Sequence, residues 1–351
     1  MEWWYDPRLS YQDNVDRGPF GAFAAVAPPP PSTAPGERFL GVPVHAAFGI
    51  PAGPLVNARF CASAFAWGFD VNVYKTVRSR ATPAHAHPNV LRVDAPGPLD
   101  HDRAMQGLRA DDDYARARSI SNSFGVPSQD PDVWQPDVAA AVASAGPGQM
   151  LIASFQGTRG ASEDAWVTDH ATTARLAVET GAPVLELNLS CPNEGTGNLL
   201  CFDPAAVVRI VDAVLSETGG VPLILKLAHF RSADGLAELV GATASVVAGY
   251  AAINTIPARL LDLAGRPALP GAGREVAGVC GESIGWAAVE MVEQLSRLRD
   301  AGDENFVIVG VGGVMTASDA QRLRAAGADG VMSATGAMMD PLLGCAVRGS
   351  G

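Results

Sequence analysis

The chain has 351 residues, which is long for an average domain but ordinary for a single α/β barrel, and 48% of them are hydrophobic, as expected of a protein with a large core. Its formal net charge is −12 and it has no long basic run, which argues against nucleic acid and against an anionic membrane surface as partners. The sequence also shows no stretch of about 20 apolar residues, no signal peptide and no Cys-x-x-Cys pair, so we expect a cytoplasmic protein without disulfides.

The first 37 residues differ from the rest of the chain. They begin with Trp3, Trp4 and Tyr5 and contain the stiff proline run 28–31. We therefore predict an N-terminal arm over residues 1–37 and one catalytic barrel domain over residues 38–351. We expect the two tryptophans to pack against the barrel or against a second subunit.

Short apolar runs, several of them rich in β-branched residues, then recur along the chain and read as strands. They span 44–53, 69–77, 150–157, 184–191, 223–230, 250–256, 306–313 and 330–338. Segments with helical spacing lie between most of them. Eight such units predict an α/β fold of the TIM type, a closed (β/α)₈ barrel, and the long interval 78–148 predicts an insertion after the second strand.

Lysine usage is the most informative single feature. The chain has 23 arginines but only two lysines, Lys75 and Lys226, and both lie at the ends of predicted strands. Because the carboxyl ends of barrel strands carry the active site, we favour two functional cations there over strand-end amines that reach out to water.

Glycine-containing turns follow the last strands, with Gly312 and Gly313 after one and Gly336, beside Thr335, after the next. Gly281 adds a third turn. Bare backbone amides at this place in a barrel favour a phosphate-bearing cofactor, although glycines also serve simply to turn a chain.

Cys191 lies in the segment Asn-Leu-Ser-Cys-Pro-Asn, where a predicted strand stops. A thiol at a polar barrel mouth is a candidate general base, and the alternative is a packed small hydrophobe. Amide side chains that both donate and accept hydrogen bonds fit a planar ring with imide groups, and they are Asn122, Asn188, Asn193 and Asn254. His85 and His87 lack a convincing third ligand, so we predict no metal site.

The segments AFGIPAGPL, YKTVRS, SNSFGVPS, NLSCPN, LKLAHF, INTI, VGVGGV and SATGAMM occur in the order seen in dihydroorotate dehydrogenases. The chain resembles this family over roughly residues 40–340. The resemblance implies an FMN-binding (β/α)₈ barrel, and the cysteine at position 191 resembles the soluble class of the family.

The resemblance also implies roles for the residues. Cys191 would take the proton from C5 of (S)-dihydroorotate while a hydride passes from C6 to N5 of the flavin, giving orotate, an intermediate of pyrimidine biosynthesis. Substrate would be held by Lys75, Asn122, Phe124, Gly125, Val126, Asn188, Asn193, Asn254 and Thr255. FMN would be held by Ala52, Gly53, Lys75, Thr76, Asn188, Lys226, Gly281, Gly312, Gly313, Thr335 and Gly336.

Some positions depart from the family pattern. Phe124, Val126 and Ser128 stand where methionine, leucine and asparagine are usual, and Cys280 replaces a serine expected in the flavin loop. Two alternatives therefore stay open: an FMN oxidoreductase acting on another dihydropyrimidine or cyclic enamide, and a flavin-binding barrel that relays electrons or has lost catalysis. The family suggests a homodimer. The electron acceptor, and any electron-transfer partner, stay open between fumarate, a nicotinamide, quinone and oxygen.

Overall fold

The computed structural model describes residues 3–25, 34–190 and 199–349. Its centre is an eight-stranded parallel sheet whose strands are β3 (Phe48–Gly49), β4 (Val71–Val77), β8 (Met150–Phe155), β9 (Val184–Asn188), β10 (Leu223–Leu227), β11 (Gly249–Ala252), β14 (Val307–Val311) and β15 (Gly330–Met332). The pairing order is β3-β15-β14-β11-β10-β9-β8-β4. The first and last strands of this order also meet, because the Asp70 amide donates to the Phe48 carbonyl (2.8 Å). Seven predicted strand ranges contain one of these strands and the eighth, 250–256, overlaps β11, which begins one residue earlier, so the predicted barrel is confirmed.

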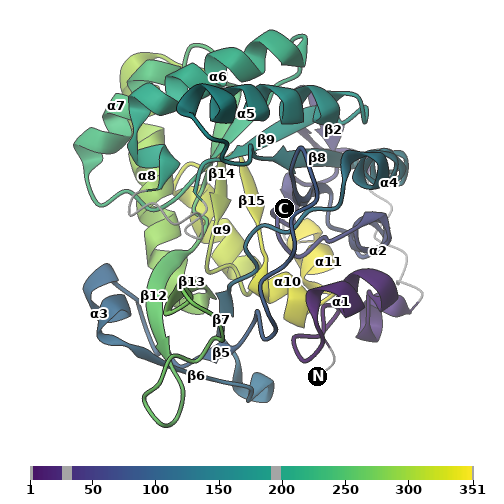
Figure 1. The fold of residues 1–351 in the computed structure, drawn as a ribbon. Coiled ribbons are helices and arrows are strands. Elements are labelled where there is room, and N and C mark those ends of the chain that lie inside the picture. The colour runs from purple at the N-terminus through teal and green to yellow at the C-terminus, as the bar shows by residue number, and fades with distance from the viewer. Residues whose placement is uncertain (1–2, 26–33, 191–198, 350–351) are drawn as a thin grey trace.

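Helices follow the strands and cover the outside of the barrel (Figure 1). They are α2 (Ala58–Ala66), α4 (Pro131–Ala143), α5 (Glu163–Val178), α6 (Pro204–Thr218), α7 (Ala233–Thr243), α8 (Gly285–Gly302), α9 (Ala317–Ala325), α10 (Thr335–Met339) and α11 (Leu343–Arg348). The last two are short, and α11 packs against β3 and α9.

Local sequence explains where these helices begin and end, and α6 is an example. The Asp203 side chain accepts a hydrogen bond from the Ala206 amide, Pro204 occupies the first turn, and Gly219 ends the helix in the left-handed region (φ 59°). Its buried face carries Val207, Ile210, Val211 and Val214. Each such side chain contributes about 1.5–3 kcal/mol when fully buried, so the helix is held mainly by this face.

The interior of the barrel changes from apolar to polar along the strands. At the amino-terminal end the side chains are apolar, with Ile152, Val184, Ile224 and Val309 in one buried cluster. The hairpin of β1 (Glu37–Phe39) and β2 (Val42–Val44) closes this end and adds Phe39 to the cluster. Polar side chains therefore gather only toward the carboxyl ends of the strands.

A second, five-stranded barrel lies at the carboxyl ends of the main strands. It consists of β5 (Arg92–Val93), β6 (Leu108–Asp111), β7 (Ser119–Asn122), β12 (Ile256–Leu261) and β13 (Val276–Gly281), with α3 (His101–Gln106) beside it. The first three strands belong to the predicted insertion, which is confirmed as a structured unit. The predicted strands leave out residues 257–281, where the structure has the β12–β13 hairpin, which pairs with β6 and β7.

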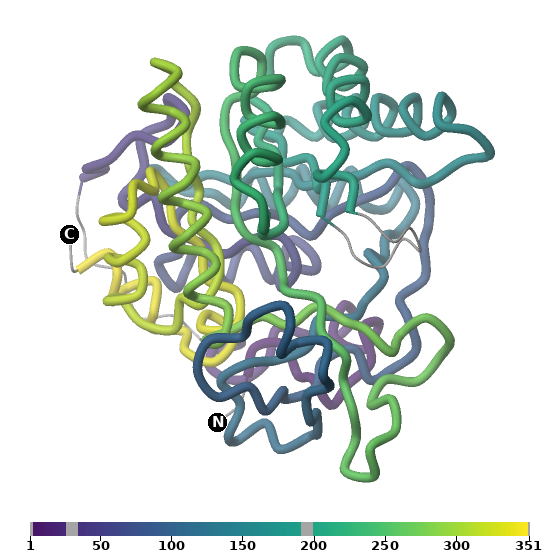
Figure 2. Tube along the Cα trace, turned by 90° about the vertical axis from the view of Figure 1, so that its left-hand side faces the viewer, coloured from purple at the N-terminus to yellow at the C-terminus, as the bar shows by residue number. Residues whose placement is uncertain are grey.

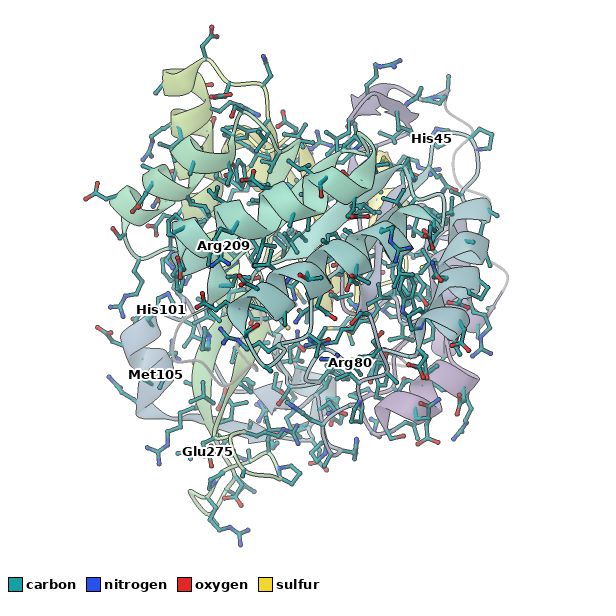
Figure 3. All side chains as sticks on the ribbon, turned by 45° about the horizontal axis from the view of Figure 1, so that its top comes forward. His45, Arg80, His101, Met105, Arg209 and Glu275 are labelled. Carbon is teal, nitrogen blue, oxygen red and sulfur yellow. The ribbon has the colours of Figure 1, made fainter. Side chains whose placement is uncertain are left out.

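The views from other sides show how this smaller barrel sits. In Figure 2 the insertion and the β12–β13 hairpin lie side by side at one end of the molecule. In Figure 3 Glu275 marks the hairpin and His101 and Met105 mark α3, while His45, at the opposite end of the main barrel, lies far from them. His101 ties α3 to the main barrel, because its Nε2 atom lies 2.9 Å from Nδ1 of His229.

The arm packs closely onto the barrel. It contains α1 (Tyr11–Arg17) and a 3₁₀ turn, η1 (Gly21–Ala24). Trp4 is fully buried and stacks on Phe23 at 4.4 Å between ring centroids, and Phe60 of α2 lies 5.7 Å from it. The proline run 28–31 lies outside the described residues. The arm therefore contributes to the hydrophobic core, and its status as a separate domain stays a prediction.

Candidate active site

A cavity opens at the carboxyl ends of the eight strands, where the smaller barrel and the arm meet the main barrel. Its volume is about 1220 Å³, counted to its open mouth. Sixteen of the predicted site residues line it: Ala52, Gly53, Lys75, Thr76, Asn122, Phe124, Gly125, Val126, Asn188, Lys226, Asn254, Thr255, Gly281, Gly312, Gly313 and Thr335. Gly336 follows Thr335 in α10 without lining the cavity, and Cys191 and Asn193 lie outside the described residues.

Both lysines reach this cavity. The register of β4 against β8 shifts between Tyr74 and Val77, which marks a β-bulge. Successive side chains of a regular strand point to opposite faces, but the bulge lets Lys75 and Thr76 both line the cavity. Lys226 comes from β10 and is 4% exposed, so its ammonium group lies deep in the cavity.

A network of amide side chains joins β9 to the segment after β11. Asn188 donates from Nδ2 to Oε1 of Gln156 (2.7 Å). Asn254 donates from Nδ2 to the hydroxyl and the carbonyl oxygen of Ser190 (3.0 and 3.2 Å). These hydrogen bonds fix which donors and acceptors the amides present to a planar ligand.

The loop after β7 forms one wall of the cavity and is held in an unusual backbone conformation. Gly125 has φ 77°, and Val126 has φ 50°, which is strained for a β-branched residue. Arg78 holds the strained residue, because its Nε donates to the Val126 carbonyl oxygen (3.0 Å). Backbone strain of this kind is concentrated at functional sites, which is consistent with a ligand-binding role for the loop.

A buried arginine, Arg274, also holds the start of this loop in place through hydrogen bonds. Arg274 precedes β13, and its guanidinium donates to the Ser123 hydroxyl and carbonyl and to carbonyl oxygens of Ala86 and Pro88. His85 packs so closely against Gly125 that a Cβ there would overlap its ring. The β12–β13 hairpin thus positions the wall of the cavity.

Three glycines of the predicted turns, Gly281, Gly312 and Gly313, line the cavity. Gly281 (φ 101°) and Gly313 (φ 73°) have backbone conformations that favour glycine. A Cβ at Gly313 would overlap Gly285, and one at Gly336 would overlap the Val314 carbonyl oxygen. Beside them, burial raises the pKa of Cys280 to about 11, against the opposing hydrogen bond from Thr335. Cys280 is therefore a neutral thiol at neutral pH.

Sequence reasoning missed several residues of the site. Tyr5 of the arm lines the cavity, and its ring lies edge-on to Phe124 at 5.9 Å. Glu186 lines the cavity from β9. The signal for Glu186 was present, since a carboxylate inside an apolar strand is unusual, whereas nothing near Tyr5 in the sequence indicated its place.

These residues fit FMN. The cavity lies at the carboxyl ends of the barrel strands, the place where barrels commonly bind phosphate-bearing cofactors. Lys226 is a buried cation that lines this cavity, so an electron-rich ring bound there would lie within reach of its charge. Gly312, Gly313 and Thr335 would offer backbone amides and a hydroxyl to the phosphate, and Lys226 would offer its charge to the flavin ring.

Neither a metal-ion site nor a membrane-spanning helix is found among the described residues. Within residues 3–25, 34–190 and 199–349 no three His, Cys, Asp or Glu side chains cluster in a way that could hold a metal ion. No helix in the same ranges is long and apolar enough to cross a membrane.

Comparisons with known proteins agree on one family. The family model for dihydroorotate dehydrogenase matches residues 114–344. A curated dihydroorotate dehydrogenase from Dictyostelium discoideum is 32% identical over 98% of this chain and 97% of its own. A dihydroorotate dehydrogenase A (fumarate) from Limosilactobacillus reuteri is 31% identical over 55% of this chain and 58% of its own.

Comparison with solved structures bears on the fold. A DHODH from Eimeria tenella, solved in complex with ferulenol, superposes with a TM-score of 0.70 over 93% of this chain and 87% of its own, at 16% identity. At this identity the likeness bears on the fold alone.

Proposed function

Because the chain belongs to the dihydroorotate dehydrogenase family, whose members are oxidoreductases, we propose that it oxidises (S)-dihydroorotate to orotate with FMN as its cofactor. The observation that carries this proposal is the cavity at the barrel mouth. It brings the chain's two lysines and the amides of Asn122, Asn188 and Asn254 together around one volume. A dihydropyrimidine with a carboxylate and an imide would use both kinds of group.

The residues would divide the work by their chemistry. Bound FMN would supply the hydride acceptor, its N5 atom, for the hydride at C6 of the substrate. Cys191 removes the C5 proton, and its thiolate is a much better base near neutral pH than a serine hydroxyl. Lys75, supported by the backbone amides of the Phe124–Val126 loop, binds the substrate carboxylate.

The amide network would orient the substrate ring. Asn188 and Asn254 are already hydrogen-bonded to Gln156 and Ser190, so their remaining donors and acceptors point in fixed directions. A preorganised set of this kind lowers the cost of placing the C5 and C6 atoms correctly. Asn193 and Thr255 would complete the contacts to the ring.

A second substrate is favoured by one specific observation. Phe124 of the cavity wall packs against Tyr5 and Tyr11 of the arm, at 5.9 and 5.8 Å between ring centroids. Phe124, which departs from the family pattern, is part of this aromatic wall, and Val126, a second departure, follows two residues later. The aromatic wall favours a related dihydropyrimidine or cyclic enamide with a less polar substituent as the alternative substrate.

The deciding experiment is an anaerobic visible spectrum of the purified protein before and after addition of L-dihydroorotate. Bleaching of a flavin band supports the proposed reaction. A flavin band that bleaches with dihydrouracil but not with dihydroorotate supports the second substrate. A band that no dihydropyrimidine bleaches contradicts both and leaves the electron-relay or non-catalytic barrel.

A matched variant tests the base. We expect Cys191→Ser to retain flavin and substrate binding but to reduce its flavin at least about 100-fold more slowly at pH 7, the usual scale of a general base.

Reoxidation of the reduced wild type with fumarate, NAD⁺, a quinone and oxygen in turn then identifies the electron acceptor. The cytoplasmic location and the homodimer stay predictions, which cell fractionation and analytical ultracentrifugation test.

A further inference from the structure

Glu186 is a carboxylic acid in the middle of the barrel. It comes from the third position of β9, is 1% exposed, and lines the cavity. Its Oε1 atom has no hydrogen-bond partner among the described residues. An unsatisfied buried oxygen of this kind costs about 1–3 kcal/mol, more for a charged group, so its retention needs a reason.

The surroundings of Glu186 hold it in place without neutralising it. Ile224 of β10 and Ser154 of β8 are its paired neighbours in the sheet. The Ser154 hydroxyl lowers the pKa of the carboxyl group, and it lies 3.0 Å from the Thr76 hydroxyl. One layer nearer the amino-terminal end, the interior is apolar, with Val184 in place of a polar group.

Lys226 is the cation whose charge acts on Glu186. It lies two residues beyond Ile224 on β10, one layer nearer the cavity mouth, and is itself 4% exposed. Burial raises the pKa of Glu186 and lowers the pKa of Lys226, and the attraction between the two opposes both shifts. Each group therefore depends on the other for its charged form.

We propose that Glu186 is a positioning residue that keeps the Lys226 ammonium charged and held against the flavin ring. The inference rests on the proposed function, because it assumes bound FMN. A buried lysine without a counter-charge sheds its proton, and a neutral amine offers little to the negative charge that a flavin gains on reduction. Lys226 pairs in register with Asn188 and Ile224 with Glu186, so the ammonium group lies one layer nearer the cavity mouth than the carboxylate.

The test is the midpoint potential of bound FMN in Glu186→Gln, which keeps the shape of the side chain and removes its charge. If Glu186 keeps Lys226 charged, the variant loses the cation at the ring. We then expect reduction to become at least about tenfold less favourable, a fall of about 30 mV for a two-electron couple. If Lys226 instead stayed charged without its partner, the potential would rise, and a rise or no change overturns the proposal.

Three further variants separate this role from a structural one. Lys226→Met should lower the potential by itself, and adding Glu186→Gln to it should produce no further fall, because Glu186 acts through the lysine. Glu186→Asp retains the charge and should keep the potential closer to wild type than to Lys226→Met. If Glu186→Gln holds no flavin, the comparison of Glu186→Asp with Lys226→Met decides. An Asp variant that matches Lys226→Met, or a double variant that falls further, overturns the proposal.

The flavin content of the wild type distinguishes this inference from the proposed function. A purified wild type that binds no FMN contradicts the proposed function itself. A wild type that binds FMN and is reduced by dihydroorotate, combined with an unchanged potential in Glu186→Gln, contradicts only the role of Glu186.

Discussion

The ion pair between Arg348 and Asp70 joins the end of the described chain to the start of β4, and its removal gives a sharp prediction. Arg348 donates from Nε to Oδ2 of Asp70 (3.0 Å), and the two side chains are only 2% and 0% exposed. Gln149 also donates to Asp70, at 3.1 Å. Arg348→Met would leave the carboxylate buried without its cation, while the methionine would keep most of the apolar contact.

Breaking a buried pair by removing one partner costs about 3–5 kcal/mol. Scaled to 351 residues, the unfolding entropy is about 0.7 kcal/mol per kelvin, so a loss of 4 kcal/mol corresponds to a Tm about 5 °C lower. The surface pair of Arg297 and Glu293, whose side chains are 72% and 47% exposed, provides the control. Arg297→Met should lower stability by about 0.5 kcal/mol or less.

The pH dependence provides a second check on the same variant. Burial raises the pKa of Asp70 even beside Arg348, and loss of the arginine should raise it further. A carboxyl group with a raised pKa in the folded state destabilises the protein above that pKa and ceases to do so below it. The difference between wild type and Arg348→Met should therefore shrink as the pH falls.

Urea unfolding and thermal melts with excess FMN, at pH 7 and pH 5, measure these differences without interference from flavin loss. An Arg348→Met variant no less stable than Arg297→Met at pH 7 would refute the reasoning. A difference that grows toward acid would refute the assignment of the effect to Asp70.

Three further predictions concern other parts of the molecule. Tyr5→Ala should raise the KM for dihydroorotate while the flavin content stays unchanged, because Tyr5 supports Phe124 at the cavity wall; steady-state kinetics check this, and an unchanged KM contradicts it. Gly313→Ala should lower the FMN content of the purified protein severalfold, since a Cβ there overlaps Gly285 and the backbone has φ 73°; absorbance at 280 and about 450 nm measures the ratio, and full flavin content would contradict the steric argument. Burial lowers the pKa of His170 to about 4, so the wild type should lose stability, by about 3 kcal/mol at most, as the pH falls from about 6.5 to 4; His170→Leu should lose less in urea unfolding over that range, and an equal loss would contradict the assignment.

The eight barrel strands were predictable because each is determined locally. A strand buried on both faces needs a short apolar run bounded by polar or turn residues, and runs such as Val71–Val77 and Leu223–Leu227 have that form. The carboxyl-end rule for barrels then placed Lys75, Lys226 and Asn188 at one mouth.

The second barrel was only half predictable, because its pairing is not local. Strand β12 begins with Ile-Pro, which is unfavourable for a strand interior, and its partners β6 and β13 come from opposite sides of it in the sequence. Arg274 supports the cavity wall only because of that pairing. It is one of 23 arginines, and the sequence around it does not distinguish it from the others. Tyr5 is more than 110 residues from Phe124, so its place in the site required the folded arm.

The polarity gradient along β9 separates two kinds of requirement on one strand. Val184 belongs to the apolar floor, Glu186 to the layer above it and Asn188 to the ligand-facing layer, a span of about 13 Å at the usual rise of a strand. Laboratory evolution for thermal tolerance could therefore explore the floor positions while leaving the ligand-facing positions fixed. The usual trade-off between thermal stability and catalytic activity would then be confined to the intermediate layer. There the Glu186 carboxylate affects both the stability of the barrel and the charge of Lys226.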